Sequence, residues 1–381
     1  MISGNPLLVK KIIARIEAEG PLSFKTFMEM ALYDPEGGYY SSHREQFGVK
    51  GDFYTSPDVH PLFGKMVARQ IAEMAEAFQD SSHFDLVEAG PGNGTLALQI
   101  FKTLLEDHPH ILNKTVCYLA EISPSMVRRQ KEVFRPFPDF QKKIKWVGSV
   151  KEIPKIEGCV FSNEFIDAMP VYRVVWKERL LEIYVDFKED LFMEVLLPPS
   201  QPEIEQYFDP FNVRWVDGQE AEINLNADIW LADAASQLER GFVLTLDYGD
   251  LAENLYSIKK KRGTFLCYRN HQTHSDPYQW IGEQDMTSHV NFSSFQKRGI
   301  TENLFPLGYT DQAHFLIGLG IIDEMERFVQ TLDDPGKDLS FRAMKHLIHP
   351  EGLGPVFKVL IQQKGMGPLE LKGLKFAKKL K

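Results

Sequence analysis

The chain of 381 residues is long enough for one large domain with an insertion or for two domains of ordinary size. Hydrophobic residues make up 43% and charged residues 25%, which is typical of a globular protein with a full core. The net charge of −10 argues against a nucleic-acid partner, and no apolar run approaches the ~20 residues that span a bilayer. Three scattered cysteines are too few for a disulfide framework. We therefore expect a cytoplasmic protein without a membrane partner, although a mature organellar protein would also fit.

The first 84 residues are predicted to form a mainly helical N-terminal region. An amphipathic pattern begins at Asn5-Pro6 and stops at Gly20, which predicts a first helix. Ser23 is a good N-cap for a second helix that runs to Tyr33, where Asp34-Pro35 ends it.

A segment rich in glycine and aromatic residues, 37–53, separates these helices from a third one near 57–78. Ser56 followed by Pro57 is typical of an N-cap and a first helical residue, whereas Pro61 offers a second start. We interpret 37–53 as a flap that closes over the active site and excludes water. The alternative is an ordinary surface loop that packs its aromatic side chains on the sheet.

Strands and helices alternate from about residue 85 to 365. Apolar runs predict strands at 86–89, 115–120, 158–162 and 241–247, and the first two are followed by a turn and a helix. A further strand is expected in the stretch "GPVFKVLIQQK". This alternation predicts an α/β domain with a mostly parallel sheet and helices on both faces.

Two segments depart from the alternation. Residues 171–197 are predicted to form two or three antiparallel strands and, with a proline-rich stretch up to about 225, make a small β insertion. The insertion could form a homodimer contact or a substrate-docking surface, and its pattern favours neither. Residues 366–381 carry five lysines against one acid, which predicts a solvated basic tail.

The strongest local signal is a glycine turn between the first strand and its helix. Gly90, Gly92 and Gly94 follow the spacing G-x-G-x-G, which differs from the dinucleotide fingerprint G-x-G-x-x-G/A. Glycines let the backbone approach a ligand closely, and the helix from Thr95 offers free N–H donors. This spacing, and Glu88 as a partner for an ammonium group, favour S-adenosylmethionine as the cofactor. The alternative is a plain strand–helix turn.

Three further residues are expected to contact that cofactor. Glu121 ends the second strand, where a carboxylate can accept hydrogen bonds from both ribose hydroxyls. Glu121 could equally be a solvent-exposed acid near a helix start. Ser149 lies where many methyltransferases present an acid to adenine, so adenine would be bound by Ser149 or by backbone groups. We add Ser56, at the start of the helix after the flap.

Polar side chains also follow two later strands. Asn163, Glu164 and Asp167 are candidate catalytic residues, because two carboxylates beside a cofactor can hold a guanidinium group. They could equally be acids at the N-terminus of a short helix. Asp247 and Tyr248 end another strand and are expected to line the substrate pocket, although a buried tyrosine with a satisfied hydroxyl is the commoner case.

The polar stretch 267–292 contains several histidines and acids, but their spacing does not match known metal sites. We expect no metal and assign Asp285 and His289 to a loop that lines the substrate pocket. The sequence has no G-x-S-x-G motif and no cysteine with suitable partners, so nucleophilic hydrolysis has no candidate.

Six motifs, in this order, resemble the MidA-like S-adenosylmethionine-dependent methyltransferases from about Pro21 to Lys364: "GDFYTSPDVHPLFG", "VEAGPGNGTL", "AEISPSMVRRQ", "SNEFIDAMPV", "LDYG" and "GEQDMTSHVNF". That family includes bacterial proteins and a mitochondrial complex I assembly factor that methylates an arginine. The resemblance implies a Rossmann-like methyltransferase sheet over residues 85–365, with an N-terminal helical extension and the β insertion.

The resemblance also implies roles for residues that match its motifs. The three turn glycines match the cofactor loop, Glu121 the ribose acid, and Asn163 and Glu164 the segment beside the transferred methyl. Pro61 and Asn291 depart from the family pattern, the second because Asp is common there. The implied function is protein arginine N-methylation, with a respiratory complex subunit as the target of the mitochondrial relative. The alternatives are a small-molecule methyltransferase and a non-catalytic assembly factor that binds S-adenosylmethionine.

Overall fold

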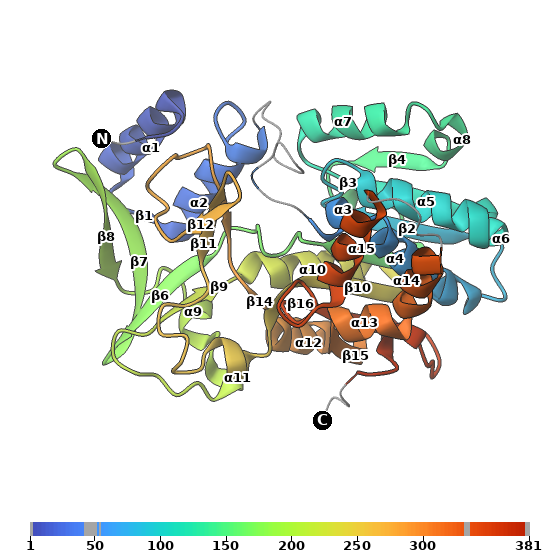
Figure 1. The fold of residues 1–381 in the computed structure, drawn as a ribbon. Coiled ribbons are helices and arrows are strands. Elements are labelled where there is room, and N and C mark those ends of the chain that lie inside the picture. The colour runs from blue at the N-terminus through green and yellow to red at the C-terminus, as the bar shows by residue number, and fades with distance from the viewer. Residues whose placement is uncertain (1–2, 42–51, 53–54, 331–335, 378–381) are drawn as a thin grey trace. The chain divides into compact units, whose positions relative to one another are not determined.

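The computed structural model describes residues 3–41, 52, 55–330 and 336–377. Its contacts divide the chain into two compact units (Figure 1). The accessory unit comprises residues 1–53, 166–229 and 249–295, and the sheet unit comprises residues 54–165, 230–248 and 296–381. The domain boundaries that we expect from the sequence pattern stay a prediction.

The sheet unit is built on seven strands in the order β15-β16-β10-β5-β2-β3-β4. Strands β4, β3, β2, β5 and β10 run parallel to one another. Strand β16 runs antiparallel to both β10 and β15. The predicted, mostly parallel sheet is therefore confirmed. The bounds of its strands are β2 Phe84–Ala89, β3 Thr115–Ala120, β4 Ile144–Val147, β5 Ile156–Asn163, β10 Leu238–Asp250, β15 Phe305–Asp311 and β16 Phe357–Lys364.

The strand order reverses between β2 and β5. The chain adds β3 and β4 on one side of β2, then crosses to add β5 and β10 on the other side. Ala89 and Ser162 lie opposite each other in this parallel pair, so both strands end at the same edge. In open α/β sheets, ligands bind beyond the carboxyl ends of the strands at such a switch point.

Helices cover this sheet on both faces, because the central strands β2, β5 and β10 carry buried side chains at nearly every position. Leu86, Phe161 and Leu244 belong to one core cluster with α4 and α5, and Phe63 and Phe101 supply large rings from those two helices. Figure 1 shows α5 and α7 alongside strands β2 to β4. The helices of this unit are α3 Ser56–Val59, α4 Leu62–Glu76, α5 Thr95–Asp107, α6 Pro109–Lys114, α7 Pro124–Phe134, α8 Pro138–Gln141, α13 Gln312–Gly318, α14 Ile321–Gln330 and α15 Gly336–Ile348. Two more helices, α10 Leu225–Gln237 and α12 Phe292–Thr301, begin in residues of the accessory unit and end in residues of this one.

The helix expected near 57–78 is broken in two. Helix α3 ends at Val59, and α4 begins at Leu62, after Pro61. The predicted N-cap Ser56 is wrong, since Thr55 precedes the helix and its hydroxyl donates to Asp58 Oδ2 at 2.7 Å. Ser56 is instead the fully buried first residue of α3. Proline is tolerated at either of the first helical positions, so Pro57 alone could not fix the start.

Antiparallel strands dominate the accessory unit, as predicted for residues 171–197. One sheet has the order β1-β7-β6-β9 with β8 paired to β7, and a second sheet has the order β12-β11-β13. The strands are β1 Leu22–Ser23, β6 Tyr172–Lys177, β7 Arg179–Lys188, β8 Leu191–Leu197, β9 Glu220–Ile223, β11 Leu266–Arg269, β12 Gln272–His274, β13 Asp285–Thr287 and β14 Val290–Asn291, and the short helices are α9 Pro202–Gln206 and α11 Ala252–Leu255.

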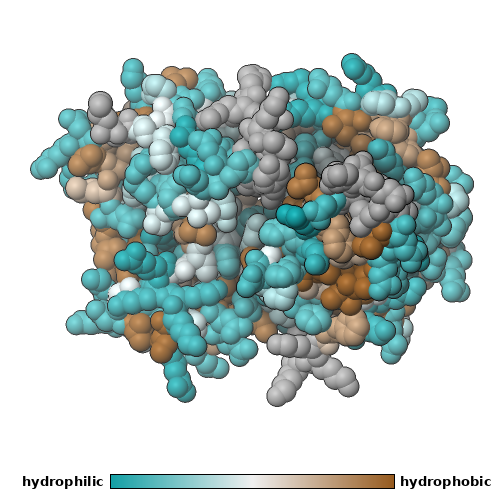
Figure 2. Space-filling model, in the orientation of Figure 1, coloured by the Kyte–Doolittle hydropathy of each residue, from teal (hydrophilic) through white to brown (hydrophobic). Residues whose placement is uncertain are grey.

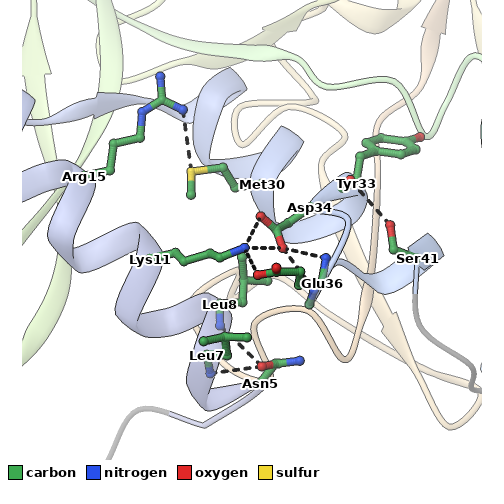
Figure 3. Close-up of polar contacts among 11 residues, drawn as sticks. Asn5, Leu7, Leu8, Lys11, Arg15, Met30, Tyr33, Asp34, Glu36 and Ser41 are labelled. Atoms are coloured by element: carbon green, nitrogen blue, oxygen red, sulfur yellow. Dashed lines mark hydrogen bonds and ion pairs between the residues drawn. The ribbon is translucent and has the colours of Figure 1, made fainter.

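The two N-terminal helices follow their capping signals. Helices α1 (Pro6–Glu19) and α2 (Phe24–Tyr33) begin after Asn5 and Ser23, whose side chains accept backbone N–H groups of the first turns. Figure 3 shows Lys11 of α1 beside Asp34 and Glu36, which follow α2, with its Nζ 3.2 Å from Asp34 Oδ2 and 2.5 Å from Glu36 Oε2. Both predicted helices are confirmed.

A buried arginine lies at the centre of the accessory unit. Arg173 on β6 donates to Glu194 at 2.5 Å and to Glu220 at 2.7 Å. Its guanidinium lies over the rings of Phe24 and Phe265, at 4.8 and 5.4 Å from their centroids. Burial alone would lower the pKa of Arg173. The two carboxylates more than offset this effect, so the pKa lies above its usual value. The charge is thus paired inside the unit, while Arg173 Nε has no hydrogen-bond partner among the described residues.

Three general features complete the fold. The three cysteines, Cys117, Cys159 and Cys267, are buried free thiols. Across the described ranges, no helix is long and apolar enough to cross a membrane. The face shown in Figure 2 is mainly hydrophilic, with small hydrophobic patches between the polar side chains.

Candidate active site

The glycine turn after β2 has a backbone that only glycine adopts without strain. Gly90, Gly92 and Gly94 have φ angles of 64°, 51° and 85°, all in the left-handed region. A Cβ atom on Gly90 would lie 2.3 Å from the Phe165 ring. The glycine spacing noted in the sequence is therefore required by the shape of this turn, which brings backbone N–H groups to the switch point.

Glu88 lies at the end of β2, just before the turn. The residue is only 2% exposed, and its Oε2 has no hydrogen-bond partner among the described residues. Burial, together with the nearby charge of Glu121, raises the pKa of Glu88 to about 8. A buried carboxylate without a partner is costly, so this position is suited to a cationic group from a ligand.

Glu121 follows β3 and is partly buried rather than fully solvated. Its carboxylate accepts the Ser123 N–H at 2.8 Å and the Gln130 Nε2–H at 3.4 Å. Burial raises the pKa of Glu121 to about 7, although both hydrogen bonds oppose that shift. The neighbouring strand β4 leads to Ser149, whose hydroxyl accepts the Lys151 N–H at 3.3 Å and caps a short 3₁₀ turn, Val150–Glu152.

Glu164 follows β5 on the other side of the switch point. Its φ of 51° is uncommon for a residue with a side chain, and such strain often marks a functional position. Its Oε1 accepts the Ser56 N–H at 2.9 Å and the Asn163 Nδ2–H at 3.1 Å, both neutral donors. Burial raises the pKa of Glu164 to about 8. Asn163 Oδ1 is also buried and has no partner among the described residues.

Asp247, on β10, supports this segment from the adjacent strand. Its carboxylate is fully buried and accepts the Phe165 N–H at 3.2 Å and the Tyr248 N–H at 2.8 Å. Asp247 therefore holds the backbone that carries Glu164, a contact that spacing along the sequence could not reveal. The Tyr248 ring packs on Phe357, with 4.0 Å between centroids.

The other predicted substrate-pocket residues belong to the accessory unit. Asp285 is buried and accepts the Tyr40 hydroxyl and the Met286 N–H, each at 2.9 Å. Burial raises the pKa of Asp285 to about 7. The Asp167 backbone carbonyl accepts the Ser288 N–H at 3.0 Å, and the His289 N–H donates to Thr264 Oγ1 at 3.0 Å. The grouping of these three residues with Glu164 stays a prediction.

Two further expectations concern the flap and metals. Most of the flap, residues 42–51 and 53, lies outside the described residues, so its closure stays a prediction. Within the described part of the chain, no group of three or more His, Cys, Asp or Glu side chains is arranged to hold a metal ion.

Comparison with known proteins identifies the family of this chain. A family model for S-adenosyl-L-methionine-dependent methyltransferases matches residues 66–310. The chain belongs to this family. A crystal structure of a relative from Burkholderia thailandensis, described as a methyl transferase and bound to S-adenosyl-homocysteine, is 28% identical, with a TM-score of 0.87, and covers 97% of this chain and 95% of that one.

Curated relatives carry a more specific description. The NDUFAF7 homologue of Drosophila melanogaster, named a mitochondrial protein arginine methyltransferase, is 26% identical over 96% of this chain and 86% of its own length. The human protein arginine methyltransferase NDUFAF7, also named mitochondrial, is 25% identical over 93% of this chain and 83% of its own length.

These comparisons confirm the predicted family, fold class, methyltransferase activity and cofactor. The residues of the site fit that cofactor, because Glu88 offers a buried carboxylate whose Oε2 has no partner among the described residues, beside a turn that favours glycine. The expectation of a cytoplasmic protein is wrong, since the curated relatives are named mitochondrial. Buried free thiols and composition distinguish an oxidising from a reducing compartment, but they do not distinguish the cytoplasm from the inside of an organelle.

Proposed function

We propose that this methyltransferase acts on an arginine side chain of a protein, with Glu164 as the residue that binds the guanidinium group. The names of the curated relatives support the substrate class. The observation that carries the assignment is the state of Glu164: a partly buried carboxylate on a strained backbone after β5, whose described hydrogen-bond partners are both neutral.

A guanidinium group would supply what Glu164 lacks. Its planar fork of N–H donors can engage a carboxylate through two charge-assisted hydrogen bonds. The raised pKa of Glu164 reflects burial without a positive charge, and an arginine would restore the ionised form. Asn163 Oδ1, buried without a partner among the described residues, could accept another guanidinium N–H.

Other residues of the chain are proposed to bind the cofactor. Glu88, the glycine turn and Glu121 would hold the cofactor through its ammonium group, amino-acid backbone and ribose hydroxyls. When bound, S-adenosylmethionine supplies an electrophilic methyl group. Methylation removes one proton from the attacked guanidinium nitrogen, and Glu164 is the carboxylate suited to orient that nitrogen and accept the proton.

The remaining sequence-based assignments are part of this proposal. Ser56 fixes Glu164 through its backbone N–H, and Asp247 fixes the following residue. Ser149 remains the candidate for adenine, and Tyr248 a wall of the pocket. Asp167, Asp285 and His289 are proposed to contact the substrate from the accessory unit.

The test is transfer of labelled methyl groups to a library of arginine-containing peptides, followed by hydrolysis and detection of methylarginine. Glu164→Gln should lower turnover at least 100-fold and change S-adenosylmethionine affinity less than threefold. Glu178→Gln is a matched control, because Glu178 is exposed and has a similar φ of 58°. Label recovered only on other residues or on small molecules would refute the substrate class. Equal losses of turnover and cofactor affinity would refute the role of Glu164.

A further inference from the structure

We infer that Gln130 is a positioning residue that joins the glycine turn to the ribose-binding acid. Gln130 lies on α7 and is fully buried, an unusual place for a long polar side chain. It is the last residue of the motif "AEISPSMVRRQ", but the motif alone gives it no role. The inference rests on the proposed placement of the cofactor at the glycine turn and Glu121.

The amide of Gln130 contacts three different segments around the switch point. Its Nε2 donates to the Gly92 carbonyl at 2.8 Å and to Glu121 Oε2 at 3.4 Å. Its Oε1 accepts the indole N–H of Trp146, on β4, at 3.0 Å. One side chain therefore connects the turn after β2, the acid after β3 and the strand β4.

The donors and acceptors fix the orientation of this amide. The Trp146 indole can only donate, so the oxygen of Gln130 must face it. The NH₂ group then faces the Gly92 carbonyl, which can only accept, and the Glu121 carboxylate, which can only accept when it is ionised. Reversing the amide would place like groups together at all three contacts. Trp146 thus holds Gln130 in the orientation in which it can support the site.

This arrangement has a consequence for how the cofactor is held. The Gly92 carbonyl belongs to the turn proposed for the amino-acid part of the cofactor, and Glu121 is proposed for its ribose. Gln130 keeps both at a fixed separation, and Gly94 leaves room for it, because a Cβ there would lie 3.2 Å from Gln130 Cγ. The hydrogen bond to Gly92 is shorter than the one to Glu121. Loss of Gln130 should therefore weaken binding of the amino-acid part of the cofactor more than binding of its ribose.

The experiment compares two ligands by calorimetry: S-adenosylhomocysteine, which has the amino-acid part, and 5′-methylthioadenosine, which lacks it. Gln130→Met keeps the volume and removes the hydrogen bonds. We expect this variant to lower the affinity for S-adenosylhomocysteine about tenfold and the affinity for methylthioadenosine less than threefold. Trp146→Phe should act in the same direction with a smaller effect. Equal loss for both ligands, or no loss, would overturn the inference.

A second variant gives a readout that general loosening of the fold would not produce. Gln130→Glu places a carboxylate against two acceptors, so S-adenosylhomocysteine should bind poorly at pH 8.5 and several-fold better at pH 6, where this carboxyl is protonated. Gln141→Glu, on α8, is the control for added charge and should show no such recovery. Loss of affinity by the same factor at both pH values would contradict the inference.

Glu121→Gln separates this inference from the proposed site. Weaker binding in Glu121→Gln with unchanged binding in Gln130→Met would refute only the role of Gln130. Unchanged binding in both variants would refute the placement of the cofactor as well.

Discussion

Two charged positions, one in each unit of this protein, differ in how the charge is matched. In the accessory unit, Arg173 is paired with Glu194 and Glu220 and covered by two aromatic rings. At the switch point of the sheet unit, Glu88 is buried and Glu164 is partly buried, but Glu88 Oε2 has no partner and Glu164 has only neutral ones within the described residues.

The difference separates a structural ion cluster from the proposed binding site. A matched cluster costs little to keep buried and fixes how strands pack, whereas unmatched carboxylates reduce stability until a cation arrives. The cofactor S-adenosylmethionine carries an ammonium and a sulfonium charge, which under our proposal would match these carboxylates.

The strongest test of this comparison removes the matched cation. Arg173→Met leaves the exposed Glu194 and the half-buried Glu220 without their partner, and we expect the free energy of unfolding to fall by about 2–3 kcal/mol, less than for a fully buried pair. Urea denaturation followed by circular dichroism measures the change. A loss below about 1 kcal/mol would mean that the cluster is not a structural element.

The opposite change at the switch point should stabilise the apo chain. Because burial raises the pKa of Glu88 from 4.5 to about 8, the folded state holds a proton that the unfolded state has released, and stability falls as pH rises through this window. Glu88→Gln should reduce the dependence of stability on pH and raise the free energy of unfolding at pH 8 by about 1–3 kcal/mol. It should also lower the affinity for S-adenosylmethionine at least tenfold. Glu121 keeps part of the slope, since its pKa is also raised. Denaturation at pH 6 and pH 8.5 tests this, and a lower stability of the variant at pH 8 would contradict it.

The smallest effect is expected at an exposed ion pair. Lys11 contacts Asp34 and Glu36 near the surface, where water screens the charges. Lys11→Ala should shift the melting temperature by no more than about 2 °C and leave cofactor binding unchanged. A larger shift would show that charge matching matters at the surface as well as in the core.

The features that were predictable from the sequence are those encoded by neighbouring residues. Asn5 and Ser23 cap α1 and α2 because their side chains bond to the next turn, and the left-handed turn at Gly90 to Gly94 needs glycine locally. The cap at Ser56 was missed by one residue, because the Thr55–Asp58 contact is as local as the proline signal and competes with it.

The features that escaped prediction depend on contacts across the fold. The pattern of β16 predicts a strand, but not that it runs antiparallel to β10. Gln130 ends one of the six motifs, but its role has no signal in its own helix, because its partners Gly92 and Trp146 are 38 and 16 positions away. Asp247 was expected in the pocket, yet its contact to the Phe165 N–H spans 82 positions.

The buried cysteines have a practical consequence for observing this enzyme at work. Burial raises the pKa of all three thiols, so none of them offers the thiolate that reacts with maleimide reagents. A cysteine introduced at an exposed position such as Glu178 would then react far faster than the native ones. A single fluorophore could therefore be attached at one chosen position of the otherwise unaltered chain.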